Sequence, residues 1–144
     1  MSSLHAENHV IQYKRIRGTI DTLMTVPEQE RDAATIATSV HWASSHLVSA
    51  IVDQLAVPEN RKHRNHRSVK QLMKHDQAVR DAIGEQVDRL HDAFVRIESR
   101  FMVKFQYGSI DKIPDYVALM GDLQEIIDIC KAITTREANK NERP

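Results

Sequence analysis

The sequence predicts an all-α protein that folds as an up-and-down four-helix bundle, with a short extra helix after the second main helix. Two observations support this prediction. Four segments of the 144-residue chain carry apolar side chains at steps of three or four residues, the spacing of one helix face. The chain also has only 4 Gly and 4 Pro, whereas a β sandwich needs turn residues every ~8–12 positions. The length suits a single domain over 1–144, with its core over about 4–135.

The first two helices are expected over residues 4–25 and from about Pro27 to Ala56. Pro27 suits the first turn of a helix, where its missing amide costs no hydrogen bond, and Pro58 ends the second helix. The stripe of the first helix is His9, Tyr13, Ile16, Ile20 and Leu23. The second helix has an inward stripe rich in small residues, namely Ala33, Ile36, Val40, Ala43, Leu47, Ala50 and Gln54.

Three further helices follow the second. A short helix over 68–74 directs Val69, Leu72 and Met73 inward. Asp76 caps a long helix to about Phe105, which tolerates Gly84 at a cost of roughly 1 kcal/mol relative to Ala. Its seam is Val79, Ile83, Val87, Leu90, Phe94, Ile97 and Phe101. The last helix is expected over 114–135, with Tyr116, Met120, Leu123, Ile127 and Cys130 inward and a polar, frayed tail over 136–144.

Composition and motifs argue against several functions. The 20 basic and 20 acidic residues balance, so the net charge implies no polyanionic partner, and no apolar run approaches the ~20 residues of a membrane span. The chain begins without the apolar stretch of a signal peptide, and its single cysteine, Cys130, fits a reducing compartment. Glycine-rich phosphate loops, CxxC pairs and HExxH are missing. We therefore expect a cytoplasmic protein without a cofactor or metal.

The segment over 61–74 is the strongest functional candidate in the sequence. Six cations and no acid lie between Asn60 and His75, which creates a local positive potential. The candidate nucleic-acid contacts are Arg61, Lys62, Arg64, Arg67 and Lys70. A second interpretation stays open, because the cations can instead face the acidic last helix, which carries Asp111, Asp115, Asp122, Glu125 and Asp128.

Arg61 and His66 have the residue types that metal-independent RNA cleavage needs. The histidine would accept the 2′-hydroxyl proton as general base, and the arginine would stabilise the charge that builds on the phosphate. These two residues are the candidate catalytic pair. The same spacing arises readily by chance in a run this rich in arginine and histidine.

The second helix and the segment after it resemble the HEPN family of small prokaryotic helical proteins. His41-Trp42-Ala43-Ser44-Ser45-His46 is similar to a tyrosine-tyrosine-alanine-x-x-histidine pattern of one branch, with His41-Trp42 in place of the tyrosines. Arg64-Asn65-His66 is similar to the lysine-x-histidine that follows there. The resemblance implies an RNA- or nucleotide-binding module, a toxin that pairs with a nucleotidyltransferase, or a non-catalytic dimer. It also makes His41, Trp42 and His46 residues of interest.

The sequence further predicts a homodimer. The apolar side chains near the long helices exceed what one thin seam needs, and they are Trp42, Phe94, Phe101, Met102, Val103 and Phe105. Three function classes therefore stand: a binding module for RNA or nucleotides that uses 61–74, an endoribonuclease that uses Arg61 and His66, and a structural or partner protein. We expect binding rather than cleavage.

Overall fold

The structure, a computed structural model, describes residues 4–55, 66–98 and 116–142, and all regular elements within those ranges are helical. The all-α prediction is therefore confirmed for the described part of the chain. The α-helices are, in chain order, α1 (Leu4–Met24), α2 (Ala33–Gln54), α3 (His66–His75), α4 (Gln77–Ile83), α5 (Val87–Arg96) and α7 (Tyr116–Glu142).

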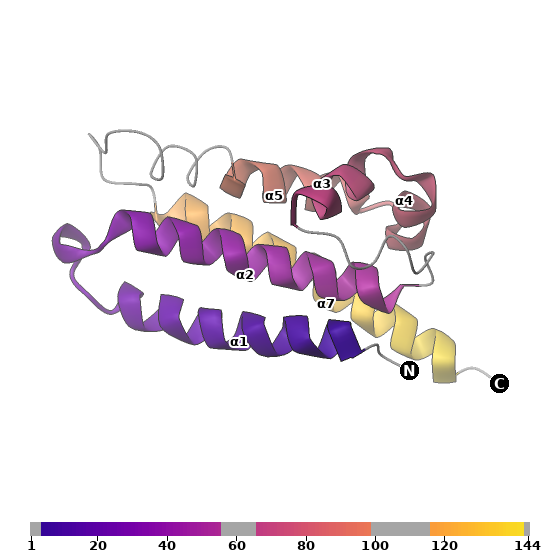
Figure 1. Cartoon of the computed structure of the whole chain (residues 1–144), viewed down its shortest axis with the longest axis horizontal. Coiled ribbons are helices and arrows are strands. Elements are labelled where there is room, and N and C mark those ends of the chain that lie inside the picture. Colours follow the sequence, from indigo (N-terminus) through magenta and orange to yellow (C-terminus); the bar gives the residue numbers. More distant parts are fainter. Residues whose placement is uncertain (1–3, 56–65, 99–115, 143–144) are drawn as a thin grey trace.

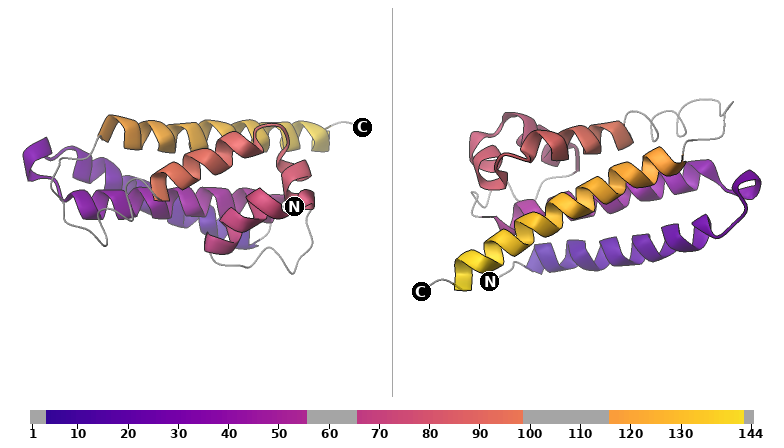
Figure 2. Two further views of the ribbon diagram at one scale, coloured as in Figure 1. Left: turned by 90° about the horizontal axis from the view of Figure 1, so that it is seen from above. Right: turned by 180° about the vertical axis from the view of Figure 1, so that it is seen from behind.

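The helix α2 is the centre of the arrangement. Figure 1 shows α1 and α2 as an antiparallel pair and α7 running along another side of α2. The shorter helices α3, α4 and α5 lie together, and α5 packs against both α2 and α7 (Figure 2). Because α2 contacts α1, α3, α5 and α7, most of its circumference is buried.

The connection between α1 and α2 differs from the prediction. Pro27 does not open the second helix but precedes one 3₁₀ turn, η1 (Glu28–Glu30). The helix begins after Asp32, whose carboxylate accepts a hydrogen bond of 3.1 Å from the Thr35 amide. An aspartate cap satisfies an amide that would otherwise lack a partner, so it fixes the helix start more strongly than a proline does. Gln54, predicted to face inward, is exposed at the end of α2.

The long helix predicted over 76–105 is broken at Gly84. Asp76 caps α4 as predicted, since its side chain accepts from the Val79 amide at 3.1 Å. Gly84 then has φ 96° and ψ −157°, a conformation open essentially only to glycine, and α5 starts at Val87. The predicted seam is nonetheless correct as far as Ile97, and its six residues up to there are buried. Phe101 and residues up to 105 lie outside the described range.

The last helix continues beyond the predicted end at residue 135, so 136–142 is helical rather than a frayed tail. Arg136 accounts for part of this extension. Its guanidinium donates to the backbone carbonyls of Ala82 and Ile83, at 2.7 and 2.8 Å, at the end of α4. Those carbonyls lack partners within their own helix, so the contact ties the two elements together.

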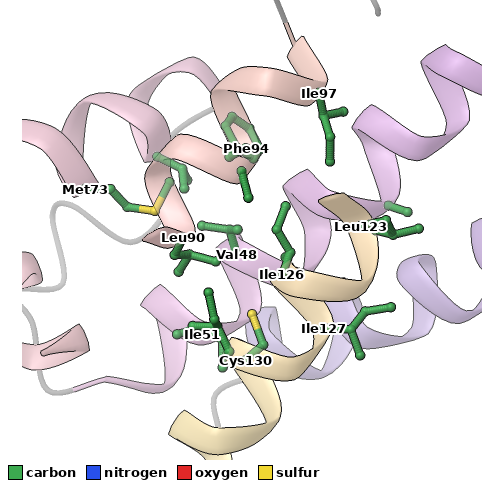
Figure 3. Packing of buried hydrophobic residues seen from close by; sticks show 14 of the residues in the cluster. Val48, Ile51, Met73, Leu90, Phe94, Ile97, Leu123, Ile126, Ile127 and Cys130 are labelled. Atoms are coloured by element: carbon green, nitrogen blue, oxygen red, sulfur yellow. The ribbon is translucent and has the colours of Figure 1, made fainter. Parts of the chain in front are cut away.

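The hydrophobic core lies where α2, α5 and α7 meet. Figure 3 shows side chains from these helices directed towards one another, among them Val48, Leu90 and Ile126. Phe94 is fully buried in this cluster, so it is not available for the dimer surface to which the sequence assigned it. Trp42 keeps 53% of its surface exposed. Within the described residues, no helix combines the length and apolar character that crossing a membrane requires.

Candidate functional site

A histidine, a carboxylate and a lysine meet where α2, α3 and α5 come together. His41 of α2 lies with its Nε2 3.3 Å from the Oε2 of Glu98, which follows α5. Lys70 of α3 donates to the other oxygen of the same carboxylate at 2.5 Å. The His41 ring also lies against Phe94, with 5.6 Å between the ring centroids. Three elements are therefore joined through one carboxylate.

Burial fixes the charges in this cluster. His41 is 6% exposed, and burial lowers its pKa below the usual value of 6.5, against the opposing effect of Glu98. Burial alone would raise the pKa of Glu98, but the hydrogen bond and charge of Lys70, together with His41, lower that pKa overall. At pH 7 the cluster thus contains a neutral imidazole beside a carboxylate–ammonium ion pair. The Nδ1 of His41 is buried and has no hydrogen-bond partner in the described part of the chain.

A second polar cluster joins α1 to α2. The Nδ1 atoms of His9 and His46 lie 2.8 Å apart, so the N–H of one ring donates a hydrogen bond to the ring nitrogen of the other. The Nε2 of His9 is 3.6 Å from the Oδ2 of Asp53, whose side chain is 1% exposed. His46 therefore contacts the neighbouring helix α1 through His9. His41 and His46 belong to different clusters, as five-residue spacing on a helix requires.

The structure reports on only part of the predicted site. Arg61, Lys62 and Arg64 lie outside the described residues, and for His66 and Arg67 only the backbone, in the first turn of α3, is described. The distance between Arg61 and His66 is therefore untested. Lys70 is the one predicted nucleic-acid contact with a described side chain, and its ammonium is engaged by Glu98.

The helix α3 anchors the basic segment on the core. Val69, Leu72 and Met73 are buried, as predicted, and they fix this helix against α2 and α5. Lys74 and His75 lie on its exposed side. The last part of the segment is thus presented to solvent from a helix that packs on the core.

The acidic face of α7 is paired with α5. Arg96 donates to Asp122 at 3.0 Å and to Glu125 at 3.1 Å, and Arg89 donates to the same Glu125 at 3.1 Å. The alternative interpretation of the sequence paired these acids with the segment over 61–74, and the two arginines were not identified from the sequence. Their spacing of seven residues, on one face of a helix, is the signal that would have found them.

Other chemistry is limited in the described part. No group of three or more His, Cys, Asp or Glu side chains there is arranged to hold a metal ion. Burial raises the pKa of the Cys130 thiol to about 12, so this cysteine is protonated at neutral pH and a poor nucleophile. No family model matches the chain, and comparisons with curated proteins and with solved structures give no match.

Proposed function

We propose that the protein is a binding module for single-stranded RNA or nucleotides, and that the basic segment 61–74 makes the contact. The observation that supports this proposal most is the pairing of Asp122 and Glu125 with Arg89 and Arg96. These acids are two of the five that were candidates to neutralise the segment from within the protein. With both engaged by α5, the segment's charge is better explained by an external anion.

The charge balance of the segment supports the same proposal. Lys70 is neutralised by Glu98, and the segment contains five further cations. Lys74 is exposed on α3. The other four, which are Arg61, Lys62, Arg64 and Arg67, fall within seven consecutive residues. Such a density matches a contact made with successive phosphates of a single strand.

The proposal is tested by measuring the affinity of a fluorescently labelled single-stranded RNA at low salt. Replacing Arg61, Lys62, Arg64 and Arg67 together by alanine should abolish most of the binding while the circular-dichroism spectrum stays helical. A control replaces four exposed cations elsewhere, Lys14, Arg15, Lys131 and Lys140, and should retain binding. Equal loss in both variants would show an unspecific charge effect, and no binding by the wild type would refute the proposal. Competition by free nucleotides distinguishes the two ligand classes.

Cleavage is the alternative outcome of the same experiment. His66→Ala should weaken RNA binding only slightly, because one neutral imidazole adds little to a contact that charges dominate. If His66→Ala abolished cleavage of the RNA and left its affinity unchanged, a metal-independent ribonuclease acting through Arg61 and His66 would replace the binding module.

We further propose an up-and-down four-helix bundle of the HEPN type, in which α4 and α5 together take the place of the third helix. The chain order and alternating directions of α1, α2, α5 and α7 support this arrangement (Figure 1). The proposal extends to a homodimer in the cytoplasm, for which the exposed indole of Trp42 offers a contact. A nucleotidyltransferase-type protein is the proposed heterologous partner.

A further inference from the structure

A groove lies between α1, α2 and α7, on residues that the RNA proposal does not use. Its volume is about 590 Å³. Apolar side chains make up most of its wall, namely Val10 from α1, Leu47, Ala50 and Ile51 from α2, and Ile127 and Cys130 from α7. Ile51, Ile127 and Cys130 also belong to the buried core cluster (Figure 3). The volume falls within the roughly 300–1,000 Å³ of small-molecule sites.

Ala50 contributes a small side chain to the lining of the groove. α1 and α7 both pack on α2, and Ala50 lies in the part of α2 that lines the groove. A larger residue at that position would fill the space. The predicted small-residue stripe of α2 therefore leaves room for a ligand here, as well as allowing close approach of helices.

The charged groups that line this groove are cations. Arg17 of α1 and Lys131 of α7 contribute to its lining, and no carboxylate does so within the described residues. The Nε of Arg17 donates to Asp21 at 3.1 Å, so the charge of Arg17 is paired within α1 and Lys131 is the cation of the lining that can meet a ligand. Cys130 adds no negative charge, because its thiol is protonated at pH 7.

We propose that this groove binds an amphipathic anion, an unbranched aliphatic carboxylate whose chain lies on the apolar wall and whose head group meets Lys131. The wall removes the alkyl chain from water, which favours binding in proportion to the apolar area buried. The lysine ammonium supplies the positive charge and the N–H donors that pair with the carboxylate. Because Lys131 is an exposed cation in the lining and no carboxylate lines the groove within the described residues, the groove favours an anion over a neutral or cationic amphiphile.

Calorimetric titration of the full chain with decanoate, below its micelle concentration, tests the proposal. Decanoate should bind with one site per chain, and decyltrimethylammonium, with a similar chain and opposite charge, should not. Lys131→Glu reverses a charge at an exposed position and should lower the affinity for decanoate at least about tenfold. Lys140→Glu, also exposed on α7 and outside this groove, is the matched control and should leave decanoate affinity unchanged.

A packing variant completes the experiment. Ala50→Phe should fill the groove and abolish decanoate binding while the circular-dichroism spectrum stays helical. If Ala50→Phe does not fold, the result for Lys131→Glu decides the test. Equal affinity for the anion and the cation would overturn the proposal, as would full decanoate binding by folded Ala50→Phe. The proposal also fails if decanoate does not bind to the wild type. If Ala50→Phe then converts a dimer to a monomer, the groove is covered by a second copy of the chain.

Discussion

His41 shows how burial decides the protonation of a single residue. Its ring is enclosed by α2, α5 and α3, and this burial lowers its pKa. The sequence indicated that His41 was of interest only through its place in a motif. Its partners Lys70 and Glu98 lie 29 and 57 residues away in the chain, so no local pattern identifies them.

Because the pKa of His41 is lower in the folded chain than in the unfolded chain, the unfolded state binds more protons just below pH 6.5. The stability that the neutral, buried His41 contributes is fully present above pH 6.5. It is lost as the pH falls from 6.5 towards the pKa of His41 in the folded chain. We therefore expect the free energy of unfolding to decrease between pH 7 and pH 5, and to decrease less in His41→Gln. Urea denaturation at several pH values measures this, with His75→Gln, on the exposed side of α3, as control. Parallel pH curves for the wild type and His41→Gln would contradict the prediction.

At the scale of elements, a substitution at Gly84 distinguishes one continuous helix over 76–97 from two helices that are broken at Gly84. In one continuous helix, Gly84→Ala would stabilise the protein by roughly 1 kcal/mol. In the structure, alanine is forced to φ 96° and its Cβ lies 3.1 Å from Arg136, so we expect a loss of about 1–3 kcal/mol. Gly18→Ala and Gly121→Ala, inside α1 and α7 with nothing within 4 Å of the added Cβ, should each stabilise by about 0.5–1 kcal/mol. Thermal denaturation compares all three, and a stabilising Gly84→Ala would show that the helix is continuous.

Helix ends were harder to predict than helix faces. The buried stripe of α5 and the inward side of α3 follow from spacing alone, because side chains three and four residues apart share a face. The helix ends depend on side chains that lie outside the helix they cap. Arg31 donates to the Met24 carbonyl at the end of α1, and Arg80 donates to the Met73 carbonyl near the end of α3. Arg136 does the same for α4 from more than fifty residues away.

The Arg136 contact predicts that the end of α7 supports the fold. Arg136→Gln removes a half-buried charge-assisted pair of hydrogen bonds to Ala82 and Ile83 and should cost about 1–3 kcal/mol. Lys140→Gln, an exposed change one turn later, should cost less than about 0.5 kcal/mol. Denaturant titration measures both variants. Equal, small effects would mean that the tail beyond residue 135 adds nothing to stability.

At the scale of the whole molecule, the exposed Trp42 predicts self-association. Sedimentation should give a species of twice the 16.5 kDa chain mass, and Trp42→Ser should return it to the monomer, because the indole is the largest apolar group left exposed on α2. Ile11→Ser, an exposed apolar residue of α1, serves as the control. A wild type that sediments as a monomer at high concentration would exclude the dimer.

The distribution of charge over the molecule is what the sequence left most open. The composition indicates a neutral chain. Whether the cations of 61–74 face an external anion or the acids of α7 depends on whether those acids already pair with other side chains of the protein. The structure places Asp122 and Glu125 beside Arg89 and Arg96, a pairing that arises only when α5 and α7 pack together. The groove likewise depends on three separate helices, so neither feature follows from local spacing.

The salt dependence of RNA binding tests the central proposal most directly. If Arg61, Lys62, Arg64 and Arg67 each contact a phosphate, the logarithm of the association constant should fall with the logarithm of salt concentration at a slope of about −3, from roughly −0.7 per phosphate. Affinity for single-stranded RNA would then drop about fiftyfold between 50 and 200 mM salt. The four-alanine variant should show a slope near zero. The same slope in the variant and the wild type would contradict a contact made by this segment.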